Sequence, residues 1–206
     1  MACSTLNGGI TFNTCAKSMG GINIVYLANY DDVDWANFDL DPEHVGQQGS
    51  DLDSDFRITS IPMLSGGSHY GFFSFKVRKN TGSMTSTLNV DDNTGASVST
   101  DLVMDWREME YEKRKAMSAF LQGEFVAIVQ DANKHYWFLG ANLACTASAG
   151  TGETGTSNTD ANHYSITIND VSNDWPFEIL VGNGGVKLNG TGGLIDPSDP
   201  AYDANA

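Results

Sequence analysis

The sequence predicts a mainly β protein, an antiparallel two-sheet sandwich or barrel with one flanking α-helix. Glycine is abundant at 22 of 206 residues and proline is scarce at 5, which suits many strands joined by turns. Short segments of alternating apolar and polar residues recur along most of the chain. Only the segment at about 108–122 has the periodicity of an amphipathic helix. A lone helix among many strands favours packing of that helix on a sheet.

Two short strands are predicted near the start of the chain, at 9–15 and 22–28, and Gly20-Gly21 links them. The second has two apolar faces, Ile22, Ile24, Tyr26 and Ala28 on one and Val25 and Leu27 on the other.

An acidic, weakly structured insertion is predicted at 29–56, because Asp and Glu dominate it. Trp35, Phe38 and Leu40 are its expected anchors. Within it, three aspartates are spaced like the opening of a calcium loop, but the glycine turn and distal glutamate of an EF-hand are missing. A solvated acidic loop is therefore the favoured interpretation. The weak calcium candidates are Asp51, Asp53 and Asp55.

A strand at 57–63 leads into three consecutive predicted strands at 70–78, 83–90 and 96–104. The two turns between these three strands both contain Asn-Thr-Gly, in which glycine can supply a positive φ. Three consecutive antiparallel strands form a meander.

The predicted helix contains no Gly, Pro, Val, Ile or Thr between 108 and 122. Acidic residues come first and basic residues follow, in the order that the helix dipole favours. Gly123 follows the last apolar residue, as a C-terminal stop should. The apolar face is predicted to carry Met109, Ala116, Met117, Phe120 and Leu121.

A β-hairpin is predicted directly after the helix. Residues 125–130 are apolar on both faces, which suits a strand buried on both sides, and 131–134 form a polar turn. Residues 135–140 return as the second strand. Later segments are a weak strand at 143–148, a mobile loop at 149–160, a strand at 164–169 and a possible strand at 175–181.

The domain organisation is predicted as one β domain over 1–181 and a Gly-, Asp- and Pro-rich extension over 182–206. The net charge of −15 argues against a nucleic-acid clamp, which needs a basic face. No apolar run is long enough for a transmembrane helix, and the start lacks the pattern of a signal peptide. The odd cysteine count favours free thiols, with a Cys3–Cys15 disulfide as the alternative and Cys145 as the third thiol.

Motifs of enzyme chemistry are missing from the sequence. It contains no GxSxG elbow, no HExxH pair and no phosphate-binding glycine loop. The four histidines are interpreted as packing or surface residues. We therefore expect no catalytic residues, no enzyme activity and no cofactor.

Aromatic residues are more informative. Phe72, Phe73 and Phe75 place apolar bulk on both faces of one predicted strand, which would leave an apolar patch in an isolated domain. Either the insertion or the helix covers this patch, or a neighbouring subunit does.

Taken together, the chain resembles the tail tube proteins of tailed bacteriophages. The resemblance rests on a strand with Gly-Gly-Ile, the predicted meander, the Arg/Lys-rich helix and the hairpin Phe-Val-Ala-Ile-Val-Gln-Asp-Ala-Asn-Lys-His-Tyr-Trp-Phe-Leu-Gly. It covers Gly21–Tyr26 and about Phe72–Ile168, roughly half of the chain, a moderately specific pattern. The insertion at 29–56 and the chain after Trp175 lie outside it.

The resemblance implies a major tail tube subunit that forms rings, hexameric in this family, which stack into a tube. Each subunit would give strands to an inner β-barrel, through which viral DNA passes without specific binding. Its partners would be further copies and other tail proteins, with no membrane, in a virion whose proteins are made in the host cytoplasm. Residues 69–104 are expected to supply lumen and ring contacts, and 29–56 or the C-terminal tail the contacts between rings. The expected assembly residues are Phe72, Phe73, Phe75, Met84, Leu88, Trp35 and Phe38.

Two alternatives remain open. One is another phage structural protein, such as a tail terminator, a connector ring or a packaged virion protein. The other is a carbohydrate-binding β-sandwich that uses Trp35, Trp137 or Trp175 as a stacking platform.

Overall fold

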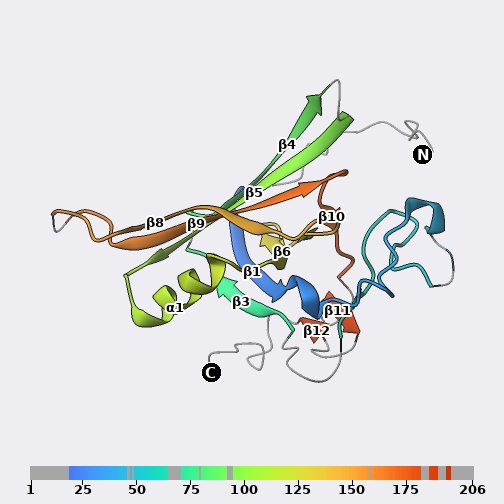
Figure 1. Cartoon of the computed structure of the whole chain (residues 1–206), viewed down its shortest axis with the longest axis horizontal. Helices are drawn as coiled ribbons and strands as arrows, with labels where there is room; N and C mark the ends of the chain where they lie inside the picture. Colours follow the sequence, from blue (N-terminus) through green and yellow to red (C-terminus); the bar gives the residue numbers. More distant parts are fainter. Residues whose placement is uncertain are drawn as a thin grey trace.

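Two large antiparallel sheets and one α-helix make up most of the fold (Figure 1). The structure is a computed structural model that describes residues 19–45, 47, 49–64, 71–78, 80–91, 95–157, 159–181, 186–189 and 194–195. The predicted strand at 9–15, together with Cys3, Cys15 and His69, lies outside the described residues.

The first sheet has five strands in the order β10-β7-β6-β1-β3. Its centre is the predicted hairpin, which is confirmed, and β6 is buried on both faces as expected. The Asp131 carboxylate closes the hairpin turn by accepting the backbone N–H groups of Asn133 and His135, each at 2.8 Å. The strands are β1 (Ile22–Asn29), β3 (Phe73–Lys76), β6 (Phe125–Asp131), β7 (Tyr136–Leu139) and β10 (Phe177–Glu178).

The second sheet has four strands in the order β4-β5-β9-β8. It packs face to face on the first sheet, so the predicted sandwich with a flanking helix is confirmed, and neither sheet closes into a barrel within the described chain. Leu102 and Ile168 from this sheet meet Val25 and Val129 from the first in one buried core. The strands are β4 (Ser83–Asp91), β5 (Gly95–Arg107), β8 (Thr146–Glu153) and β9 (His163–Ser172).

The other face of the first sheet is covered by residues 30–64. Val33, Phe38 and Leu52 are buried there against Tyr26 and Ile128. The insertion is thus better anchored than the sequence suggested, because its few apolar residues complete a second core. Its short elements are the 3₁₀ turns η1 (Tyr30–Asp32) and η2 (Pro42–His44) and the strand β2 (Ile61–Pro62).

Part of the predicted C-terminal extension joins this region. β11 (Val186–Asn189) pairs in parallel with β2 and antiparallel with β12 (Leu194–Ile195). A three-stranded sheet therefore links residues 186–195 to the predicted strand at 57–63, directly after the insertion.

The predicted three-strand meander is wrong in its first strand. β3 pairs with β1 through Val25 and Phe75, while β4 pairs only with β5. The chain therefore crosses from the first sheet to the second just before β4. Gly82 sits at this crossing, where a Cβ atom would lie 2.4 Å from Val77 Cγ1 and 2.7 Å from Ile22 Cγ1. The glycine is needed for this close approach rather than for a hairpin turn.

The helix α1 (Tyr111–Phe120) is shorter than the predicted 108–122. Glu108 adopts a φ of 67°, which delays the start of the helix and leaves Met109 in the preceding turn. Phe120 is buried as predicted, but Leu121 is 79% exposed, so the predicted apolar face is wrong at its last residue. Gly123 does follow the helix, and its reason is steric, because a Cβ there would overlap the Phe125 ring.

The strand β8 is longer than the predicted strand at 143–148 and includes residues 149–153, five of the twelve residues expected to be a mobile loop. Its sequence, Thr-Ala-Ser-Ala-Gly-Thr-Gly-Glu, contains few good strand formers. It is a strand because β9 supplies a complete antiparallel partner for it. None of the described helices is long and apolar enough to cross a membrane.

Candidate assembly interface

The four-stranded sheet has two free edges. β4 forms one edge and β8 the other, and neither outer side pairs with a described strand. The two edges have similar lengths, nine and eight residues. Because every neighbouring pair in this four-stranded sheet is antiparallel, β4 and β8 run in opposite directions. Each edge presents unpaired backbone groups that can accept another strand.

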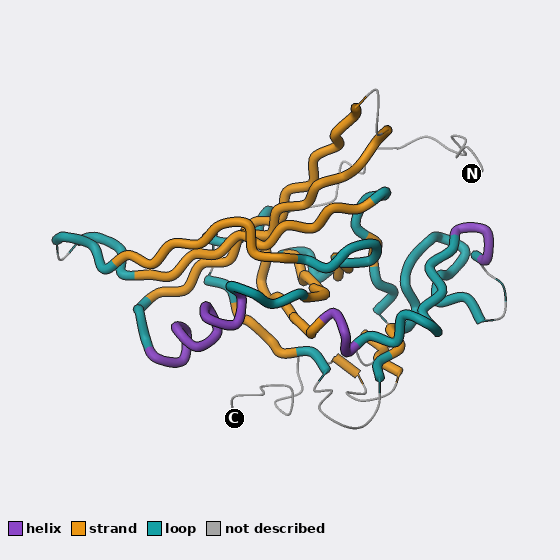
Figure 2. The backbone as a smooth tube through the Cα atoms, viewed as in Figure 1, coloured by secondary structure: helices purple, strands orange, loops and turns teal. Residues whose placement is uncertain are grey.

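The two edges are staggered along the strand direction. β4 lies opposite residues 95–103 of β5, whereas β8 lies opposite residues 163–169 of β9, which pair with 101–107 of β5. The offset is about five residues, or about 17 Å at about 3.3 Å per residue. As a result the β4–β5 hairpin and the β8–β9 hairpin project beyond the sandwich at opposite ends, as Figure 2 shows.

The outward face of this sheet, turned away from the first sheet, carries mostly hydroxyl, amide and carboxylate groups, with Val103 and the exposed Val171 as apolar exceptions. Asn169 Nδ2 donates to Ser99 Oγ at 2.9 Å and to Asp101 Oδ1 at 2.8 Å across the strands. Within the paired strands, Arg107 at one end of β5 is the only Lys or Arg at an outward position. The outward positions include Thr85, Thr87, Ser99, Asp101, Ser165, Thr167, Asn169, Thr146 and Thr151.

The inward side of β4 carries an apolar stripe that runs out along the projecting hairpin. Met84 packs partly against the core, and the hydroxyls of Ser86 and Thr100 hydrogen-bond at 2.8 Å. Further along, Leu88 is 51% exposed and Val90 is 73% exposed. Leu88 and Val90 thus lie on the inward face of β4 but beyond the region that the first sheet covers.

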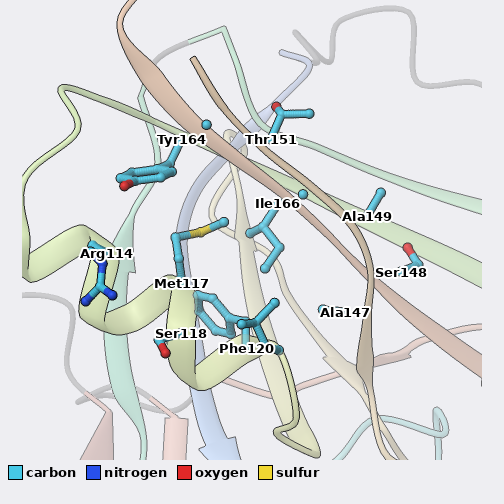
Figure 3. Close-up of a pocket in the computed structure, with 13 residues that line it drawn as sticks. Arg114, Met117, Ser118, Phe120, Ala147, Ser148, Ala149, Thr151, Tyr164 and Ile166 are labelled. Atoms are coloured by element: carbon cyan, nitrogen blue, oxygen red, sulfur yellow. The ribbon is translucent and has the colours of Figure 1, made fainter. Parts of the chain in front are cut away.

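A groove of about 460 Å³ lies between α1 and β8, at the other edge of the sheet (Figure 3). The side chains of Met117 and Phe120 extend from α1 toward the strands, and Ile166 of β9 lies across from them. The side of the groove formed by β8 is shallow, because the residues at its inward positions are small. They are Ala147, Gly150 and Gly152.

A second, wider groove of about 770 Å³ lies between α1 and the free edge of β3. Phe73, Phe75 and Trp106 line it together with Lys113 and Lys115. These lysines belong to the basic run of the helix in a chain whose net charge is −15.

The predicted assembly residues divide into two groups. Phe72 and Phe38 are core residues, 2% and 9% exposed. Trp35 stacks on Tyr30 with ring centroids 4.6 Å apart. Phe75 contacts the rings of Trp106 and Phe120, so the helix covers it, as one of the two sequence interpretations expected.

Phe73 and Leu88 are the predicted assembly residues with exposed side chains, and Met84 is half-buried. The sequence interpretation missed Val90 as well as two exposed leucines, Leu121 and Leu143. Val90 continues the alternation of Met84 and Leu88, which was a usable signal. Leu143 lies in a turn, where no periodicity marks it, and Leu121 was assigned by periodicity to the buried face of the helix.

The three aspartates considered for calcium have partners within the chain. Asp51 accepts the hydroxyl of Ser60 at 2.6 Å and the backbone N–H of Asp39 at 3.1 Å. Asp53 and Asp55 both form ion pairs with Arg57, at 2.8 and 2.9 Å. In the part of the chain that the structure describes, no group of three or more His, Cys, Asp or Glu side chains is arranged to hold a metal ion.

Two titratable groups are buried between the sheets. Burial raises the pKa of Asp170 to about 6, although the N–H of Gly140 donates to its carboxylate. Burial, with a smaller effect of Asp170, also raises the pKa of the Cys145 thiol. Cys145 is fully buried and free. Neither group lines either of the two grooves described above, so we assign both to the core.

The tryptophans considered for carbohydrate stacking do not form one platform. Trp35 packs on the core beneath the insertion, whereas Trp137 packs on the core between the sheets, so they lie on opposite faces of the first sheet. Trp175 is 51% exposed in the turn before β10.

No protein-family model matches the chain, and the comparisons with curated proteins and with solved structures give no match either. The geometry of the sheet edges is therefore the basis for a functional conclusion.

Proposed function

We propose that the protein is a self-assembling structural subunit, the major tail tube protein of a tailed phage, whose four-stranded sheet continues from copy to copy around a ring. The proposal rests mainly on the two free edges of this sheet, β4 and β8, which run in opposite directions. Strand edges of this length are a liability in a monomer, because they pair readily with other strands.

The strand directions support closure by rotation. Suppose that the ring axis is roughly parallel to the strands. A rotation about this axis then leaves the direction of each strand the same in every copy. β4 of one copy then lies antiparallel to β8 of the next, and the alternation of the sheet is unbroken. Such a head-to-tail contact closes into a ring when the rotation permits. The stagger between the edges supplies the strand tilt that a closed barrel requires.

The position of the first sheet determines which face would line the channel. The first sheet and α1 occupy the inward side of the four-stranded sheet, so they have room only on the outside of a ring (Figure 1). The face of Thr, Ser, Asn and Asp side chains would then line the lumen. With Arg107 as its only strong cation, this lining would repel phosphates rather than bind them, which suits passage of DNA.

Negative-stain electron microscopy of the purified protein, run beside light scattering, tests this proposal. We expect tubes with a regular axial repeat and a central channel. Single rings that never stack would instead favour a terminator or connector ring. A chain that stays monomeric at every concentration and ionic strength would overturn self-assembly altogether.

A further inference from the structure

We propose that the groove between α1 and β8 is filled by Leu88 and Val90 of a second copy of the chain. The inference rests on the proposed ring and adds to it a specific side-chain contact. It assigns the groove an occupant and gives the exposed end of β4 a partner.

The first observation is the exposed stripe on β4. β9 pairs with β5 only from Val98 onward, so the outer part of the β4–β5 hairpin is a two-stranded ribbon. Val90 lies on the inward side of this ribbon opposite Ala96, and Leu88 lies on the same side at the base of the ribbon, opposite Val98. An apolar stripe on a projecting ribbon is a typical contact surface.

The second observation is the shape of the groove. The inward positions of β8 are Ala147, Gly150 and Gly152. A Cβ on Gly150 would lie in ordinary contact with Met117 Cε at 3.6 Å, whereas a Cβ on Gly152 would lie only 2.7 Å from the Tyr164 ring, so the open part of the groove is beside Ala147 and Gly150. Small residues at a free edge leave space between that edge and the helix. The space is lined mainly by the apolar side chains of α1 and β9, as Figure 3 shows.

Exposed leucines lie in the turn after α1 and in the turn before β8, and the first of them, Leu121, also lines the groove. Phe125 and Cys145 exchange backbone hydrogen bonds of 3.0 and 2.8 Å, which bring together the turn after α1 and the turn before β8. These turns carry Leu121 and Leu143, 79% and 60% exposed. An apolar rim at this position would contact the end of an incoming strand.

Register connects the stripe with the groove. If β4 adds antiparallel to β8 of the next copy and keeps polar side chains on the outward face, its inward side chains must lie beside the inward positions of β8. Among the registers that keep this pattern, we assign the one in which Leu88 and Val90 neighbour Ala147 and Gly150, because large side chains then meet small ones. One copy cannot make this contact by itself, because the stripe and the groove lie at opposite edges of its sheet.

Paired substitutions on β4 test the inference. Leu88→Ser should raise the concentration needed for assembly by roughly tenfold or more, because it removes apolar area from the contact. The matched control is Thr87→Ser, a neighbouring exposed residue on the outward face, and it should leave the threshold within about twofold. Circular dichroism and thermal unfolding of the unassembled chain should be unchanged for both variants, since neither side chain is buried in the monomer.

Disulfide trapping supplies a second measurement. In a background with Cys3 and Cys15 replaced by Ser, chains with Ala147→Cys are mixed with chains with Leu88→Cys or Val90→Cys and oxidised. We expect a covalent dimer from at least one of these mixtures and none from the control mixture with Thr87→Cys. Tubes that form normally with Leu88→Ser, and without cross-links, would overturn this contact and leave the ring standing. A wild-type chain that never assembles would overturn both.

Discussion

The buried carboxylate of Asp170 accepts a hydrogen bond from the backbone N–H of Gly140 at 3.2 Å, and this bond ties the four-stranded sheet to the end of β7. Its raised pKa, about 6 against an ordinary 3.8, means that the folded chain holds this proton more tightly than the unfolded chain does. The corresponding stabilisation is complete below about pH 4 and is lost as the pH rises through about 6, a change of about 3 kcal/mol.

Asp170→Asn should remove this dependence, because Asn cannot ionise and its side-chain oxygen can still accept from Gly140. We expect the variant to unfold at higher urea than the wild type at about pH 7.5, with a much smaller difference at about pH 5. Asp31→Asn, at an exposed position, is the control. An equal response of both variants at the two pH values would contradict the assignment.

Gly82→Ala should destabilise the fold by about 1–3 kcal/mol, because the new methyl group would overlap Val77 and Ile22 where the chain crosses between the sheets. Gly20→Ala is a matched control, since a Cβ there meets no atom within 4 Å. Chemical denaturation of the two variants measures the difference. Equal stabilities would show that the crossing is looser than the structure indicates.

Asp51→Ala should loosen the insertion, because it leaves the buried Ser60 hydroxyl and the Asp39 N–H without their acceptor. The cost should be about 1–3 kcal/mol, with faster amide hydrogen exchange across 37–60. Asp55→Ala removes only the surface ion pair with Arg57, in which the Asp55 side chain is 69% exposed. The loss of unfolding free energy should therefore stay below about 1 kcal/mol. Calcium should leave the unfolding temperature unchanged. A rise that Asp51→Ala abolishes would revive the calcium hypothesis.

Salt should promote assembly if apolar and backbone contacts hold the copies together. Copies with a net charge of −15 repel one another, and the repulsion weakens as the Debye length shortens. Light scattering at increasing sodium chloride should show a falling threshold concentration. A rising threshold would point instead to charge pairs, with the basic run Lys113-Arg114-Lys115 as the first site to mutate.

The sequence was most informative where both faces of a strand are apolar. β1 and the β6–β7 hairpin were predicted correctly because apolar residues on both faces, such as Val25 and Val129, indicate a strand covered on both sides. The pairing of β3 was not predictable from its own pattern. Phe73 and Phe75 alternate in the same way whether the next strand lies beside them or in another sheet, and the steric demand at Gly82 arises only from long-range packing.

The candidate interface was predictable only in part. Leu88 follows the alternation of a strand, so the sequence could single it out. β8 was predicted only over its first three residues, within the weak strand at 143–148, because Gly150 and Gly152 have low strand propensity and form a strand only through β9. The groove depends on the absence of side chains at these positions, a property that becomes visible only when α1 is placed beside them.

The strict alternation on β4 also gives the proposed ring a means of rejecting errors. A slip of one residue between neighbouring copies would turn Leu88 and Val90 into the water-filled channel and press Thr85 and Thr87 against Met117. Each misaligned contact between neighbouring copies would thus lose apolar contact area and would also bury hydroxyl groups without hydrogen-bond partners. Only slips by an even number of residues keep the apolar side chains of β4 toward the groove and its polar side chains toward the channel. The allowed registers therefore differ by steps of two residues. A copy that docks one residue out of register would therefore dissociate faster than a copy that docks in register.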